Sequence, residues 1–117
     1  MSGPKYKELL VWQKAHELAK AIYIATKEFP KEESYGLTSQ LRRAALSVPT
    51  NIVEGMGRGS TGEMRQFTNI ALGSLAEVEY LLEFCFEIGY FTGQEYEKLA
   101  AIRKETGALL WKFYQKV

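Results

Sequence analysis

The chain of 117 residues has one cysteine, one histidine and no aspartate, and these shortages exclude several classes of protein. A lone cysteine cannot form an internal disulfide, and Cys85 lies in the apolar run LLEFCFEI, where cysteine usually packs as a small core residue. The single histidine, His16, excludes the paired Glu-x-x-His units of di-iron bundle enzymes, and no serine has a base at a recognisable spacing. We therefore expect no cofactor, no metal and no enzymatic activity.

Long apolar runs are missing as well. The sequence has no stretch of about 20 apolar residues, and its first residues, MSGPKYKE, lack the apolar segment of a signal peptide. We therefore expect a cytoplasmic protein that does not contact a membrane. A chain of 117 residues with 46% hydrophobic content can bury one core, which predicts a single domain over residues 1–117.

Apolar residues instead recur every three or four positions in four segments, a spacing typical of amphipathic helices. The first helix is expected over residues 8–29, because Pro30 disfavours helix at the residue before it. The third and fourth begin with the capping boxes Ser60–Glu63 and Thr92–Glu95. Short connections favour antiparallel neighbours, so we predict an all-α, up-down-up-down four-helix bundle. The predicted core positions, in chain order, are Val11, Ala15, Leu18, Ile22, Ala25, Phe29, Leu41, Ala45, Val48, Ile52, Met56, Phe67, Ala71, Ser74, Val78, Leu81, Cys85, Ile88, Leu99, Ile102, Thr106, Leu109 and Phe113.

The second helix, which includes QLRRAALSVPTNIVEGMGR from residue 40 to 58, contains a proline inside its helical pattern. We expect Thr38 or Ser39 to cap its start. Pro49 removes one backbone hydrogen bond of a helix, at a cost of about 3 kcal/mol. Because the apolar spacing continues to Met56, we predict one helix that Pro49 kinks without ending it. The glycines at 55, 57 and 59 resemble a phosphate-binding loop, but no strand precedes them, which favours a helix C-terminus with turn glycines.

A polar stripe follows the same spacing on another face of this helix. Its members are Gln40, Arg43, Ser47, Asn51, Glu54 and Arg58. One interpretation is an ordinary solvated face. The other is a surface for contact between subunits, because Arg and Asn make directional hydrogen bonds and Glu54 with Arg58 forms an i,i+4 pair. We take the stripe, together with Glu77 of the third helix, as the candidate subunit interface.

Charge is unevenly distributed along the chain. The net charge is +1, yet residues 60–89 hold one basic residue, Arg65, and five glutamates, a balance of −4, so the remainder carries +5. This separation suits helix pairing across an interface or a basic patch elsewhere. The 15 aromatic residues exceed what four narrow seams need, so Tyr23, Trp111 and Tyr114 either widen the core or contact other subunits.

Several ordered pieces of the sequence resemble one protein family. They are QLRRAALSVP followed by NIVEG and Arg58, VWQKA near the start, FP with Glu33 and then YGLT, and ALGSL with Glu77. Together they resemble the bacterial four-helix-bundle family typified by proteins encoded in intervening sequences of large-subunit ribosomal RNA genes. Members of that family are similar to the accessory variability protein of diversity-generating retroelements, a homopentameric barrel that binds nucleic acid and a reverse transcriptase.

The resemblance implies two functions that the residues alone do not separate. The first is a homo-oligomer, expected to be a pentamer, that binds RNA or DNA through Arg42, Arg43, Arg58 and Arg65. The second is a structural adaptor that binds a protein partner, such as a reverse transcriptase, and uses its arginines in salt bridges between subunits. The near-neutral net charge favours the adaptor somewhat.

Overall fold

The computed structural model describes residues 5–117, and every regular element in that range is helical. The four long helices are α1 (Leu10–Ala25), α2 (Leu37–Arg58), α3 (Thr61–Glu87) and α4 (Gly93–Lys116). Three short 3-10 helices flank α1, namely η1 (Lys5–Glu8), η2 (Thr26–Glu28) and η3 (Lys31–Glu33). Between residues 5 and 117 no helix has the length and apolar character that crossing a membrane requires.

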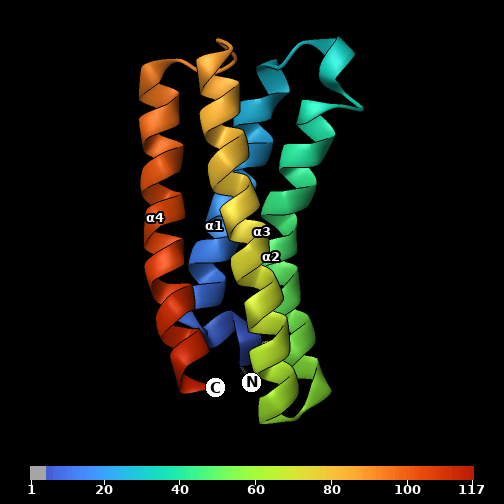
Figure 1. The fold of residues 1–117 in the computed structure, drawn as a ribbon, viewed down its shortest axis with the longest axis vertical. Helices are drawn as coiled ribbons and strands as arrows, with labels where there is room; N and C mark the ends of the chain where they lie inside the picture. Colours follow the sequence, from blue (N-terminus) through green and yellow to red (C-terminus); the bar gives the residue numbers. More distant parts are fainter. Residues whose placement is uncertain (1–4) are drawn as a thin grey trace.

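The four long helices pack side by side in chain order, each antiparallel to the next (Figure 1). α1 packs against α2 and α4, and α3 packs against the same two helices, so α1 and α3 occupy opposite corners. The bundle is elongated, with extents of 43 × 27 × 23 Å, and the described start of the chain and its C-terminus lie at the same end. The predicted all-α four-helix bundle is confirmed.

Helix α2 continues through its proline without a break in the assigned helix. Pro49 is buried, and the predicted seam residues Leu41, Ala45, Val48 and Ile52 on either side of it are fully buried. The apolar face is therefore continuous, as the spacing predicted. A bend of the axis at Pro49 remains a prediction.

One core runs the length of the bundle and includes most of the predicted positions. Ala25, Met56, Leu109 and Phe113 are partly buried and pack against the core, and Phe67 and Ser74 are half-buried. In the last turn of α4 the fully buried residue is Leu110, because after Thr106 a step of four keeps the residue in phase with a 3.6-residue repeat. One predicted core position is wrong. Ile88, the residue that caps the C-terminus of α3, is 46% exposed, so the buried seam of α3 ends at Cys85.

The helix ends correct the predicted boundaries. α1 begins at Leu10 rather than residue 8, because residues 5–8 form η1, and it passes into η2 before Pro30. Neither Thr38 nor Ser39 caps α2, since both lie inside the helix. The carboxylate of Glu33 takes that role, because its Oε1 accepts a hydrogen bond from the Leu37 amide at 3.1 Å, and an anion is favourable at a helix N-terminus.

The two predicted capping boxes differ. At α4 both bonds form, because the Glu95 amide donates to Thr92 Oγ1 at 3.1 Å and the Thr92 amide donates to Glu95 Oε1 at 2.8 Å. At α3 the Glu63 amide donates to Ser60 Oγ at 3.2 Å, but the Glu63 carboxylate accepts from the Ser60 hydroxyl rather than from its amide. Gly59 ends α2 with φ at 82°, which confirms the predicted helix C-terminus.

Candidate interaction surface of helices α2 and α3

The middle of the polar stripe holds α2 against α3. Ser47 Oγ and Ser74 Oγ are 2.8 Å apart, one hydroxyl donating to the other across the two helices. The side-chain amide of Asn51 donates through Nδ2 to both the Ser47 carbonyl oxygen, at 2.8 Å, and Ser47 Oγ, at 2.9 Å. All three side chains are half-buried. Ser47 and Asn51 are therefore already hydrogen-bonded inside one chain.

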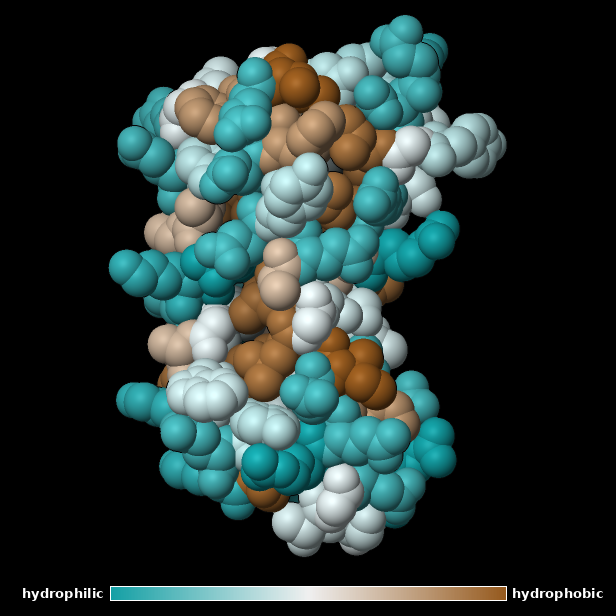
Figure 2. Space-filling model, in the orientation of Figure 1, coloured by the Kyte–Doolittle hydropathy of each residue, from teal (hydrophilic) through white to brown (hydrophobic). Residues whose placement is uncertain are grey.

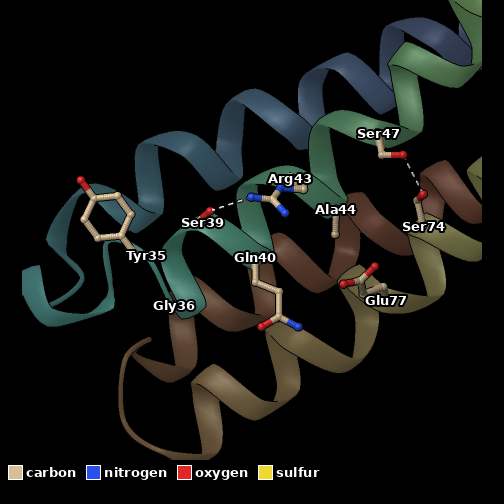
Figure 3. Close-up of a pocket in the computed structure, with 9 residues that line it drawn as sticks. All are labelled: Tyr35, Gly36, Ser39, Gln40, Arg43, Ala44, Ser47, Ser74 and Glu77. Carbon is tan, nitrogen blue, oxygen red and sulfur yellow. Dashed lines mark hydrogen bonds between the residues drawn. The ribbon is translucent and has the colours of Figure 1, made fainter.

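Toward the start of α2 the same face opens into a polar groove, which we call the α2–α3 groove. It has a volume of about 540 Å³, and its lining residues are Tyr35, Gly36, Ser39, Gln40, Arg43, Ala44, Ser47, Ser74 and Glu77. Gln40 from α2 and Glu77 from α3 lie at its two walls (Figure 3). Arg43 is exposed and donates a long hydrogen bond of 3.4 Å to Ser39 Oγ. The structure thus brings four of the seven interface candidates into one groove.

Of the other three candidates, Asn51 bonds to Ser47 as described above, and Glu54 and Arg58 lie toward the other end of α2. Arg58 pairs with Glu54 at 3.2 Å and, more loosely, with Glu63 of α3 at 3.8 Å. Its guanidinium also lies 5.2 Å from the ring centroid of Phe67. All three ionic groups are about half exposed, so these pairs contribute little to stability on their own.

Gly55 lets the two helices approach closely beside this pair. A Cβ at that position would lie 2.8 Å from Met64 Cε and 3.1 Å from Phe67 Cβ. Both distances are shorter than ordinary carbon contacts. A side chain at Gly55 would therefore push α2 and α3 apart or displace the two α3 residues.

Two of the four arginines predicted to bind nucleic acid serve the fold. Arg42 donates to Thr26 Oγ1 at 2.8 Å and to the Tyr23 carbonyl oxygen at 3.1 Å, and it lies over the Tyr23 ring. This cation satisfies carbonyl and hydroxyl acceptors at the C-terminal end of α1. Arg65 does the same for α4, where its Nη1 donates to Tyr114 O at 3.1 Å and Val117 O at 3.0 Å.

The four arginines do not form one cluster in a single chain. Arg42 and Arg58 are 16 residues apart on α2, which corresponds to about 24 Å along the helix. Arg58 and Arg65 instead lie at the end of the bundle that holds the C-terminus. We call this the basic end and define it as residues 5–12, 53–68 and 110–117, which contain six basic residues and three glutamates. The opposite end, residues 23–42 and 80–98, has four basic and seven acidic residues, and we call it the acidic end.

Neither Cys85 nor His16 lines the α2–α3 groove. Burial, with a smaller effect of Glu33, raises the pKa of the Cys85 thiol to about 11, so it stays protonated in the core. Exposed His16 stacks on the Trp12 ring with centroids 4.7 Å apart. Within residues 5–117 no cluster of three potential metal ligands occurs. The groove offers hydroxyl, amide, guanidinium and carboxylate groups, all suited to hydrogen bonding.

Sequence reasoning missed an exposed apolar stripe on α3, which we call the α3 stripe. It consists of Ile70, Tyr80, Phe84 and Ile88, which are 45%, 64%, 37% and 46% exposed. Hydrophobic side chains also gather along the middle of the face that α3 crosses (Figure 2). The signal was present in the sequence, because separations of ten, four and four residues place these positions near one face of a helix.

The fold and these surfaces define an antiparallel four-helix bundle with a polar helix–helix groove and no recognisable catalytic centre in its described part. The chain matches the 23S rRNA-intervening sequence protein family over residues 7–112, and it belongs to that family. The predicted family resemblance is thereby confirmed. Comparison with curated proteins gave no match.

A solved structure supports the same assignment. It is the crystal structure of a protein of unknown function from the S23 ribosomal protein family of Bacteroides thetaiotaomicron VPI-5482. The two chains are 25% identical, the TM-score is 0.81, and the match covers 91% of this chain and 96% of the other.

Proposed function

We propose that this protein is a non-enzymatic homo-oligomer that assembles through the α2–α3 side of the bundle and binds nucleic acid as an assembly. The observation that carries the first part is the α3 stripe. Four large apolar side chains lie exposed on a bundle whose own core is complete without them. Clustered exposed apolar side chains, such as Tyr80 beside Phe84, are typical of protein interaction sites.

A second apolar surface provides a partner for the α3 stripe. Tyr23, Ile24 and Leu46 are exposed and line a shallow groove between α1 and α2. This surface lies on a neighbouring side of the bundle. A contact between two different surfaces is head-to-tail, and it closes into a ring when the rotation between copies allows.

Charges at the edges of the two surfaces are complementary. Lys20 and Lys27 border the α1–α2 groove, whereas Glu77 and Glu83 lie beside the α3 stripe. Opposite charges at the rim of an interface fix its register and speed association. The number of copies, five, comes from the family resemblance alone.

Nucleic acid is the ligand we propose for the assembly. The family description connects its members with 23S ribosomal RNA genes, and the basic end of each bundle carries an excess of three positive charges. The second candidate is the adaptor that binds a protein partner such as a reverse transcriptase. It is favoured by Arg42 and Arg65, whose guanidinium groups are engaged within the chain.

Light scattering coupled to size exclusion tests the assembly. We expect a mass several times the 13.3 kDa of one chain at micromolar concentration, and a monomer would overturn the proposal. Phe84→Ala and Phe86→Ala form a matched pair, because both residues are on α3 and are 37% and 38% exposed, but only Phe84 belongs to the stripe. Phe84→Ala should lower the mass, and Phe86→Ala should leave it unchanged.

A salt titration of binding to mixed RNA and DNA distinguishes the nucleic-acid-binding function from the protein adaptor. Phosphate contacts produce a steep fall in affinity with salt, whereas a ring that binds no polynucleotide at low salt leaves the adaptor as the function. Arg43→Glu then shows whether the α2–α3 groove is part of the subunit interface or of the ligand site. Arg43 is exposed, so its replacement should not unfold the bundle. Loss of the assembly would place Arg43 at the interface, and loss of binding alone would place it at the ligand.

A further inference from the structure

Three planar side chains form a stack at the basic end of the bundle. The guanidinium carbon of Arg65 lies 4.1 Å from the ring centroid of Tyr114. The Tyr114 ring in turn stacks on Trp111, with centroids 5.6 Å apart and an angle of 29° between the planes. Trp111 is 52% exposed, so part of its indole faces solvent.

The stack is held in place by the fold. Arg65 Nη1 donates to the backbone oxygens of Tyr114 and Val117, which ties the start of α3 to the end of α4. The guanidinium therefore positions the Tyr114 ring, and that ring supports one face of the indole. An aromatic side chain that is already fixed loses little conformational entropy when a ligand stacks on it.

Three lysines of α4 lie near Trp111 along the helix. Lys112 follows Trp111 directly, Lys104 lies two turns earlier on the same face of α4, and Lys116 lies one turn beyond Lys112. None of the ion pairs among the described residues involves Lys104, Lys112 or Lys116.

We infer that the Arg65–Tyr114–Trp111 stack is a platform for a base of single-stranded nucleic acid, with Lys104, Lys112 and Lys116 contacting the phosphates beside it. An exposed aromatic ring within a basic surface is the combination that binds unpaired bases without sequence preference. Bases of a duplex are already stacked on each other, so the platform selects single strands. This inference rests on the proposed nucleic-acid function and names its surface.

The bundle contains its own control. Phe86 and Tyr96 also stack, with centroids 4.6 Å apart and planes at 12°, but they lie at the acidic end and have no arginine in the stack. Phe86 is 38% exposed. Phe86→Ala therefore removes an exposed, stacked aromatic ring where no nucleic acid is expected to bind.

The test uses the intrinsic fluorescence of the chain, which has two tryptophans. Trp12→Phe leaves Trp111 as the only reporter, and the variant is titrated at low salt with 12-nucleotide oligo(U), oligo(dT) and an RNA duplex of the same length. We expect both single strands to quench Trp111 and the duplex to bind more weakly. In the otherwise unaltered protein, Trp111→Ala should weaken single-strand binding roughly 5- to 150-fold, Trp111→Phe should retain most of it, and Phe86→Ala should have no effect.

The outcomes distinguish this inference from the function on which it rests. If single strands bind but neither quench Trp111 nor respond to Trp111→Ala, the platform is wrong and the nucleic-acid function stands. If no oligonucleotide binds the unaltered protein, both fail. If Trp111→Ala lowers the mass in light scattering, the indole contacts a second copy of the chain and the platform is likewise wrong.

Discussion

Substituting Gly55 by leucine measures how closely α2 and α3 must approach. Gly57, two residues later in α2, is the matched control, because a Cβ there would meet no atom within 4 Å, whereas one at Gly55 would lie 2.8 Å from Met64 Cε. Leucine raises helix propensity by a similar amount at both positions, so that contribution cancels in the comparison. The difference is then the overpacking cost, which is about 1–3 kcal/mol for a well-packed site.

That difference is large enough to measure by thermal unfolding. An unfolding entropy of about 2.1 cal/mol/K per residue corresponds to about 0.25 kcal/mol/K for a chain of this length. Gly55→Leu should therefore melt about 4–12 °C below Gly57→Leu when both are followed by circular dichroism at one protein concentration. Equal melting temperatures would show that Met64 and Phe67 move aside freely, and the close contact of α2 with α3 would then have no energetic consequence.

Three further predictions concern single contacts. Hydrogen bonds from the Leu37 backbone amide and the Tyr90 hydroxyl hold the Glu33 pKa below its ordinary 4.5. The stability that Glu33 provides is therefore fully present above pH 4.5 and is lost as the pH falls through the lowered pKa. Glu33→Gln should therefore show a shallower loss of unfolding free energy in acid, measured by urea titrations across that range. Cys85, with its pKa raised to about 11, should react with a thiol reagent at neutral pH far more slowly when folded than in denaturant. Ser47→Ala and Ser74→Ala should each cost about 1 kcal/mol, and a double-mutant cycle should give a coupling of at least about 0.5 kcal/mol, whereas additive losses would contradict a direct bond.

The sequence predicts the helices and most of the core because both depend on local chemistry. Periodic apolar positions and the Thr92–Glu95 box are read directly from neighbouring residues, and the structure agrees with them. The α2 cap could not be read in this way. Glu33 lies four residues before the helix, and its carboxylate reaches the Leu37 amide only because the 3-10 turn of residues 31–33 places it there.

The candidate surfaces are harder to predict, since they depend on which residues from different helices meet. A stripe on α2 was visible in the sequence, but the bond from Ser47 to Ser74 requires the relative height of α2 and α3. The contacts of Arg42 and Arg65 also depend on which helices lie next to each other, so the sequence did not predict them. The charge of these arginines suggested a ligand, whereas in the structure both donate to acceptors at the C-terminal ends of α1 and α4.

The uneven charge along the bundle links the proposed assembly to the proposed ligand. One chain carries a net charge of only +1, which by itself is weak attraction for a polyanion. In a closed ring all copies point the same way along the symmetry axis, so bundles aligned with that axis would place every basic end on one rim. Each copy would add an excess of three positive charges there, and the acidic ends would collect on the opposite rim. Assembly would thus create a strongly basic surface that the single chain lacks, and the affinity for nucleic acid should fall steeply in any variant that dissociates the ring.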